Sequence, residues 1–400
     1  MFYTLFVSVN WFVWKLAEMR AFLLDLETEI RKRNGVCLEN GMKILLILAM
    51  AVSSFSVVRK ENVSVFRLYV ECNHDMDGDG WMDCIQLLVF VPGGGGVFPT
   101  VLLANPYGMG TWTEDVPVSS QPSSAPMGYG KRRERLQEAL PSNDPFAAEL
   151  WMDERDRDLI HQLLEEGYAA AVCAGPGTFG SDGWNTVLGS QERAAWTSIV
   201  SFLRNEEAAF LEPGGGRITN AFWSNGTLLF LGHSYGGAIG LSLVQQDPAL
   251  FDAMILSAPV TDWQKWYETA LRHSSQPLAD LARFCSSKVF EERERNAYLF
   301  FLSLLETEAA SGKAWNERTY LDARPECPVL LLTSFRDEII PSSSVYELFS
   351  LWEESGIPVS VGLHSGGHMV PDIPSFFADW MDEAGRRGSV SSRVYEFFGK

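Results

Sequence analysis

The sequence TLLFLGHSYGGAIG, from Thr227 to Gly240, decides the fold of this chain. An apolar run rich in Leu and Phe, typical of a buried strand, enters the turn, and small residues after Ser234 open a helical pattern. A serine between a strand and a helix exposes its hydroxyl from a strained turn, so the neighbouring residues must lack bulk. Gly232 and Gly236 meet this need. The stretch predicts a nucleophile elbow, and its flanking patterns disfavour a chance match among 34 glycines.

An acid and a histidine follow in the chain order of an α/β-hydrolase. PVLLLTSFRDEIIP, from residue 328 to 341, is a buried-strand pattern that ends in a loop carrying Asp337. PVSVGLHSGGHMV, from residue 358 to 370, is the next strand and breaks into a Gly-flanked loop with His368. Because the carboxyl ends of parallel strands meet at one edge of a sheet, we expect Ser234, Asp337 and His368 to lie together.

Each of the two partners has an alternative nearby in the sequence. Glu338 could replace Asp337, but Asp337 is favoured because it comes first after the strand. His364 competes with His368. His364 belongs to the apolar alternation of the strand, whereas His368 lies in a loop that can reach Ser234, so we favour His368.

Strand and helix patterns alternate along most of the chain, which implies the α/β class with a mostly parallel sheet flanked by helices. We predict an α/β-hydrolase domain over residues 61–400. Between residues 262 and 326 the sequence is helical, rich in aromatic residues and too long for a simple connection. It therefore predicts a helical cap inserted above the active site.

Residues 1–60 differ from the rest and form a predicted N-terminal extension. MKILLILAMAVSSFS, which begins at Met42, has a lysine, a short apolar run and small residues. That is the layout of a secretory signal peptide over residues 42–57, so we expect translation to start at Met42. Export to the periplasm or the extracellular space is favoured over a cytoplasmic location. A signal anchor and a buried helix are the alternatives, and no stable membrane span is expected.

Composition excludes some classes of partner. The 400 residues are 46% hydrophobic and 12% aromatic, enough for one large domain with an insertion. The formal net charge of −19 argues against a nucleic-acid partner, because phosphate binding needs clustered Lys and Arg.

An acidic stretch is a weak calcium-loop candidate, with alternate carboxylates at Asp75, Asp77 and Asp79 and with Asp83 beyond. The twelfth position of such a loop is Gln86 and not Glu, so an ordinary Asp-Gly hairpin turn is favoured.

Two cysteines lie on either side of the acidic stretch. Cys72 and Cys84 are symmetric about Gly78, so a hairpin centred there would place them opposite each other. A cross-strand disulfide and two half-buried free thiols are equal alternatives.

Several stretches together resemble those of the Xaa-Pro dipeptidyl-peptidase-like serine hydrolases, a family that includes cocaine-esterase-type acyl hydrolases. In chain order they are DMDGDGWMD, ANPYG at residues 104–108, GPGTFGSDG at residues 175–183, GHSYGG, SFRDEIIP and LHSGGH. The likeness runs from about Phe66 to about Trp380. The sequence departs from the family at His233, where the family often has another residue, and we expect no counterpart of the family's large C-terminal β-sandwich domain after His368.

The resemblance implies that the Tyr107 hydroxyl donates to the oxyanion, although Tyr107 could instead be a turn aromatic packed on the core. The second donor would be the backbone N–H of Tyr235. From the residue types, His368 takes the proton of Ser234 while Asp337 holds the imidazole. No metal or organic cofactor is required.

The resemblance also implies the substrate, a peptide from which an N-terminal Xaa-Pro dipeptide is released. An esterase or amidase of small acyl compounds is the alternative, and a non-catalytic exported binding protein is a third. A prolyl-oligopeptidase relative is disfavoured because no propeller-sized region is present. Trp184, Trp263 and Trp266 are the pocket candidates. Asp182, with Glu192 as the alternative, is the candidate carboxylate for the free amine.

Overall fold

The computed structural model describes most of the chain after residue 62. The described residues are 63–76, 78, 80–107, 154–178, 180–213, 215–270, 277–286, 288–369, 380 and 394–397. The chain divides into two units, Met1–Arg59 and Lys60–Lys400, and every described residue lies in the second. The predicted extension and signal peptide thus lie outside the described residues. Among the residues described, no helix has the length and apolar character to cross a membrane.

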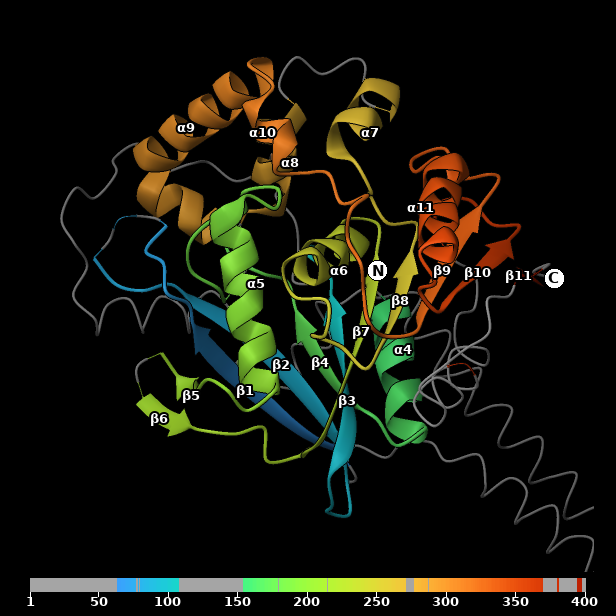
Figure 1. Cartoon of the computed structure of the whole chain (residues 1–400). Coiled ribbons are helices and arrows are strands. Elements are labelled where there is room, and N and C mark those ends of the chain that lie inside the picture. Colours follow the sequence, from blue (N-terminus) through green and yellow to red (C-terminus); the bar gives the residue numbers. More distant parts are fainter. Residues whose placement is uncertain are drawn as a thin grey trace, which may run out of the picture. The chain divides into compact units, whose positions relative to one another are not determined.

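The strands of the described residues form one eleven-stranded sheet, drawn in Figure 1. They are β1 Val63–Glu71, β2 Cys84–Pro92, β3 Phe98–Ala104, β4 Ala169–Cys173, β5 Ala209–Glu212, β6 Gly215–Ile218, β7 Ser224–His233, β8 Ala253–Ser257, β9 Val329–Ser334, β10 Val359–His364 and β11 Val394–Phe397. Their order is β11-β10-β9-β8-β7-β3-β4-β2-β1-β5-β6. All pairs from β4 to β11 are parallel, and β2, β1, β5 and β6 join antiparallel at the other edge. The predicted mostly parallel sheet is confirmed.

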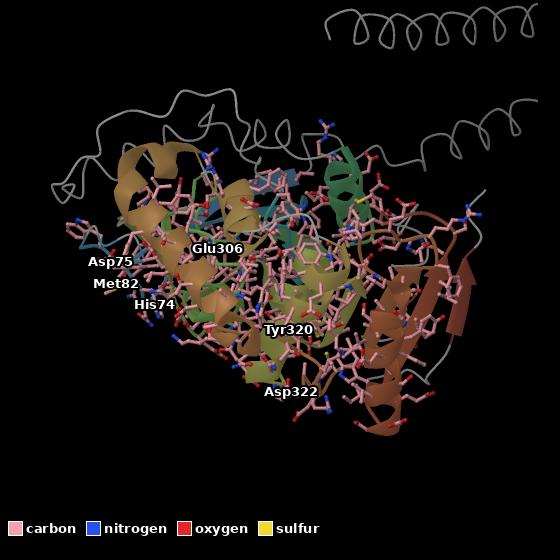
Figure 2. All side chains as sticks on the ribbon, turned by 90° about the horizontal axis from the view of Figure 1, so that it is seen from above. His74, Asp75, Met82, Glu306, Tyr320 and Asp322 are labelled. Carbon is pink, nitrogen blue, oxygen red and sulfur yellow. The ribbon has the colours of Figure 1, made fainter. Side chains whose placement is uncertain are left out.

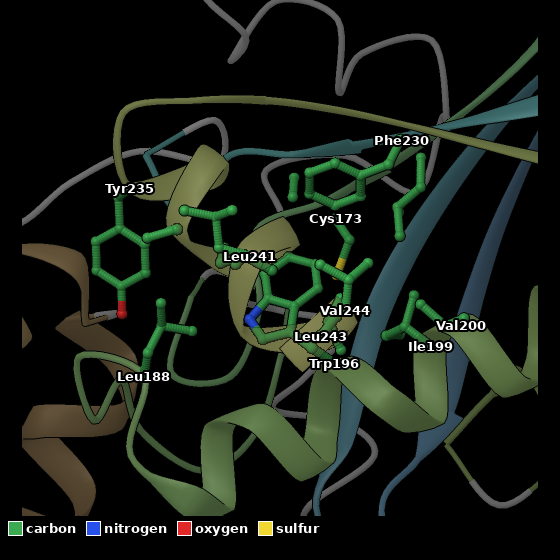
Figure 3. Packing of buried hydrophobic residues seen from close by; sticks show 14 of the residues in the cluster. Cys173, Leu188, Trp196, Ile199, Val200, Phe230, Tyr235, Leu241, Leu243 and Val244 are labelled. Carbon is green, nitrogen blue, oxygen red and sulfur yellow. The ribbon is translucent and has the colours of Figure 1, made fainter. Parts of the chain in front are cut away.

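Helices cover both faces of this sheet. They are α4 Glu154–Glu165, α5 Ser190–Leu203, α6 Tyr235–Gln246 and α11 Ser342–Glu354. Because side chains alternate along a strand, β7 supplies both cores. Its Leu229 and Leu231 join the cluster that contains α4, whereas Phe230 joins the larger cluster with α5, α6 and α11. Figure 3 shows Phe230 packed near Trp196 of α5 and Val244 of α6. Each such buried side chain contributes about 1.5–3 kcal/mol, which fixes β7 and α6 around the turn between them.

Helices also fill the connection between β8 and β9. In the described part of the chain they are α7 Trp263–Ala270, α8 Pro277–Cys285, α9 Lys288–Ala310 and α10 Lys313–Asn316. Figure 1 shows them grouped together beyond α5 and α6. They line an open pocket of about 710 Å³, whose surface is part polar and part apolar. All four lie within residues 262–326, the range for which the sequence predicts a cap.

The register of β1 and β2 decides between the two cysteine alternatives. Glu71 pairs with Cys84, and the N–H of Cys72 donates to Asp83 O at 2.8 Å. The hairpin is therefore one residue away from the symmetric register, and a one-residue shift turns a side chain to the opposite face. Cys72 joins the larger core cluster, while Cys84 packs with Tyr69. The disulfide alternative is wrong, because Cys72 and Cys84 are both buried without a disulfide bond between them.

Candidate active site

Ser234 lies in the turn between β7 and α6, where the sequence predicts the elbow. Its φ is +55° and its ψ is −114°, a backbone conformation that residues other than glycine rarely adopt. The Ser234 N–H donates to Ser257 O at 2.8 Å, and the Ser234 carbonyl accepts the N–H of Ala238 at 3.1 Å. Bonds from β8 and α6 thus hold the strained residue in place.

The glycines of the elbow are required by close backbone approaches. A Cβ atom at Gly236 would collide with the carbonyl oxygen of Ala104 at the end of β3. A Cβ atom at Gly232 would collide with the carbonyl of Gly236 itself. Both glycines of the G-x-S-x-G pattern are therefore required, because the turn packs tightly on itself and on the end of β3.

Asp337 and His368 form a hydrogen-bonded pair at the ends of β9 and β10. His368 Nδ1 lies 2.9 Å from Asp337 Oδ2 and 3.1 Å from Oδ1. The Asp337 side chain is only 1% exposed. Its Oδ1 also accepts the N–H groups of Ile339 and Ile340, each at 2.8 Å. Burial raises the pKa of Asp337, but the hydrogen bonds from His368, Ile340 and Ile339 outweigh burial and lower the pKa below its usual value. Asp337 is thus a carboxylate that fixes the imidazole.

The pair stands beside the elbow. The ring of His368 lies 4.6 Å from the ring of His233, the residue directly before Ser234. The Ser334 hydroxyl donates to Gly366 O and so joins the acid loop to the histidine loop. No hydrogen bond joins Ser234 Oγ to His368 among the described residues, and in free enzymes this bond is often long until substrate binds.

The two alternative residues have different surroundings. Glu338 is exposed. His364 ends β10 and is buried, and burial lowers its pKa. The structure therefore brings together Asp337 and His368, which favours them over Glu338 and His364.

Tyr107 follows β3 and lies against the elbow. Its N–H donates to Asn105 Oδ1 at 3.0 Å. Its ring packs edge-on against the ring of Tyr235, with centroids 6.2 Å apart, and also contacts Phe284. Burial raises the pKa of Tyr107 well above its usual value, so the phenol stays protonated and can donate a hydrogen bond. The Tyr107 ring is packed, as expected for a turn aromatic on the core. Its protonated hydroxyl is also the form that the oxyanion role needs.

Sequence reasoning missed the position of Glu192 behind Tyr235. The carboxylate is buried and accepts the Tyr235 hydroxyl at 2.8 Å and the N–H groups of Thr186 and Leu188 at 2.8 and 3.0 Å. Burial raises the pKa of Glu192, and the hydrogen bonds that it accepts lower the pKa by less, so the pKa lies above its usual value. With its oxygens engaged in this way, Glu192 is disfavoured as the carboxylate for a substrate amine. Its place in the first turn of α5 is the sequence signal that indicates a structural carboxylate.

Replacing Glu192 by Ala is expected to lower the free energy of unfolding by about 3 kcal/mol, because several buried donors lose their acceptor. Urea denaturation measures the change. Glu206→Ala is the control, since its side chain is 60% exposed, and its effect should stay within about 1 kcal/mol. Equal stability of the two variants would contradict the structural role of Glu192.

The three tryptophans predicted for the pocket are all packed. Trp184 stacks on Phe301 with centroids 5.3 Å apart. Trp263 is buried and lies edge-on to Tyr235 at 5.0 Å. The indole N–H of Trp266 donates to Ile339 O at 3.0 Å, beside Asp337. The burial of Trp263 disfavours contact with a substrate, and the binding role of all three stays a prediction.

Asp182 is also buried. Its N–H donates to Cys84 O and its carbonyl accepts the N–H of Gly177, both at 2.9 Å. This position beneath the surface disfavours a contact between Asp182 and a substrate amine.

The predicted calcium loop is described only in part, because Asp77 and Asp79 lie outside the described residues. Asp75, labelled on the left side of the protein in Figure 2, accepts the N–H of Gly80 at 2.9 Å. Asp83 is buried and accepts the N–H of Met76 at 2.9 Å. Carboxylates that bind the backbone of their own loop in this way favour the turn interpretation.

Residues 77–370 match the family model described as X-Pro dipeptidyl-peptidase (S15 family). The Xaa-Pro dipeptidyl-peptidase of Ligilactobacillus salivarius is 24% identical over 339 residues, 76% of this chain and 42% of that protein. A putative Xaa-Pro dipeptidyl-peptidase of Rhodopirellula baltica is 25% identical over 360 residues, 82% of this chain and 55% of that protein. A Pyrococcus horikoshii acylaminoacyl peptidase structure has a TM-score of 0.46 at 13% identity, covering 81% of this chain and 42% of that one.

This chain thus spans about half the length of the curated relatives that it matches. The family match covers most of the chain and includes the elbow with Ser234 and the paired Asp337 and His368. On this evidence, the chain belongs to the X-Pro dipeptidyl-peptidase (S15) family.

Proposed function

We propose that the chain is a serine peptidase that releases Xaa-Pro dipeptides from the N-termini of peptides. The observation that carries this proposal is the His368–Asp337 pair beside a serine held at a strained elbow. Membership of the family supports the substrate class. Export, which rests on the pattern of residues 42–57, is part of the proposal.

The proposed chemistry uses Ser234 as the nucleophile, His368 as the base and acid, and Asp337 as the partner of His368. Ser234 Oγ attacks the carbonyl carbon of the scissile bond while His368 Nε2 takes its proton. Asp337 keeps the other proton of the imidazole on Nδ1 and stabilises the cation that forms. His368 then gives the proton to the leaving amine, and the C–N bond breaks. Water attacks the acyl-enzyme with His368 as the base, which releases the dipeptide and restores Ser234.

Replacing Tyr107 by Phe is expected to lower kcat by about 10²- to 10³-fold with little change in KM, because the phenol would donate only to the oxyanion of the transition state. Steady-state kinetics measure this split. Tyr168→Phe, beside the α4 core cluster on the other face of the sheet, is the control. An unchanged kcat in Tyr107→Phe would leave this tyrosine with a packing role only.

Three chromogenic substrates test the proposed activity: a Gly-Pro anilide, its N-acylated form and a short-chain aryl ester. Turnover of the free-amine anilide, without turnover of the N-acylated form, is the expected result. Turnover of the ester alone would instead place the chain among esterases of small acyl compounds. If all three substrates stay intact, the non-catalytic binding protein becomes the better account.

A further inference from the structure

We propose that three exposed apolar side chains beside the Asp337–His368 pair form a binding site for the leaving group. We call Phe335, Ile339 and Met369 the apolar rim. The site would favour a bulky apolar residue directly after the scissile bond. This inference rests on the proposed hydrolytic function and adds a preference on the leaving-group side.

The members of the apolar rim bracket the pair in the chain. Phe335 and Ile339 lie two residues before and two residues after Asp337, and Met369 follows His368 directly. The three residues are 71%, 44% and 45% exposed, respectively. Single exposed apolar residues are normal on a protein surface, so what distinguishes these three is their place next to Asp337 and His368.

The loops that carry the apolar rim are held in place. Directly before Phe335, the Ser334 hydroxyl donates to Gly366 O, which joins this loop to the histidine loop. The Phe335 ring stacks on Tyr346 of α11 at a centroid distance of 6.3 Å and an angle of 16°. One face of the ring is therefore supported by α11, while most of the side chain stays open to solvent.

Ile339 is held from the opposite side. Its N–H donates to Asp337 Oδ1 at 2.8 Å, and its carbonyl accepts the indole N–H of Trp266 on α7 at 3.0 Å. The hydrogen bonds that orient the carboxylate thus also fix the backbone from which the Ile339 side chain projects. A preorganised apolar surface loses little freedom when a ligand covers it, so it can contribute to binding.

The direction of proton transfer decides which part of the substrate would reach the apolar rim. When the C–N bond breaks, the leaving nitrogen must take its proton from His368 and so must lie next to that ring. The residue that carries this nitrogen leaves on the histidine side of the site. Met369 follows His368 there, and the hydrogen bond from Ser334 to Gly366 joins the loop of Phe335 to the histidine loop. The dipeptide, bonded to Ser234, stays on the other side. An apolar side chain on the leaving residue would therefore cover the apolar rim.

The test compares Gly-Pro-Phe-amide with Gly-Pro-Gly-amide. The unmodified chain is expected to show a kcat/KM about tenfold higher for the Phe peptide, the size of effect that one apolar contact gives. In Phe335→Ser the ratio of the two values should fall close to one. Phe300→Ser is the matched control, because Phe300 is 65% exposed on α9 and outside the apolar rim. Its ratio should equal that of the unmodified chain.

Met369→Ser keeps the test decisive if Phe335→Ser does not fold, and it should lower the same ratio. An unchanged ratio in the folded variants would overturn the proposal, as would an equal loss for both peptides. Acetate esters of ethanol and 2-phenylethanol test the apolar rim independently of the dipeptidyl-peptidase activity. If neither peptide is cleaved but Phe335→Ser removes a preference for the phenylethyl ester, the dipeptidyl-peptidase activity fails and the apolar rim stands. If that preference is absent or unchanged, or no ester is cleaved, the apolar rim fails as well.

Discussion

Replacing Ser234 by Ala should abolish hydrolysis, with a loss of kcat of about 10⁶-fold. The physical reason is that the alanine has no oxygen to attack the scissile carbonyl, so His368 and Asp337 have no hydroxyl at this position to activate. The strained φ of +55° at residue 234 stays the same in the variant, because Ala and Ser both have a Cβ atom. We therefore expect the fold to persist, and circular dichroism with thermal denaturation will measure it.

Ser343→Ala is the control for this result, since Ser343 is exposed in the first turn of α11. It should keep full activity in the same assay. If Ser234→Ala were folded and still hydrolysed the Gly-Pro anilide at more than a small fraction of the normal rate, another residue would be the nucleophile.

Replacing Asp337 by Asn is expected to lower kcat by about 10⁴-fold. The amide has nearly the same shape as the carboxylate, but it can present an N–H to His368 Nδ1 and so stabilise the wrong imidazole tautomer. It also removes the negative charge that stabilises the imidazole cation. Steady-state kinetics on the Gly-Pro anilide measure the loss, after circular dichroism has shown that the variant and the unmodified chain are equally folded.

Glu338→Gln is the matched control for the acid, because Glu338 is the alternative next to Asp337 and is exposed. We expect this variant to differ from the unmodified chain by less than about twofold, as for surface substitutions in general. A larger loss in Glu338→Gln than in Asp337→Asn would transfer the role of the acid to Glu338.

The sequence was sufficient to predict the elbow and the sheet. The run into Ser234 is apolar on both faces because β7 is covered by helices on both sides, so a continuous apolar run marks a central strand. Asp337 and His368 were predictable because both follow such strands, and parallel strands bring their carboxyl ends to one edge. The pairing of these two side chains then follows from neighbouring strand ends.

The rest depended on contacts that no local pattern contains. The role of Glu192 becomes clear only when α5 packs beside α6, which brings the carboxylate to the Tyr235 hydroxyl. The positions of Cys72 and Cys84 depended on a register that differs by one residue from the symmetric one. Because that shift exchanges the faces of the sheet, the symmetry of the sequence could not decide between disulfide and free thiols.

The central claim is that Ser234 is an activated nucleophile served by His368 and Asp337. The most direct measurement is reaction of the folded chain with a fluorophosphonate, followed by peptide mapping with mass spectrometry. The account predicts a single modified peptide that contains Ser234, and slower labelling in Asp337→Asn. Modification of a different residue, or no modification under conditions that label an active serine hydrolase, would contradict it.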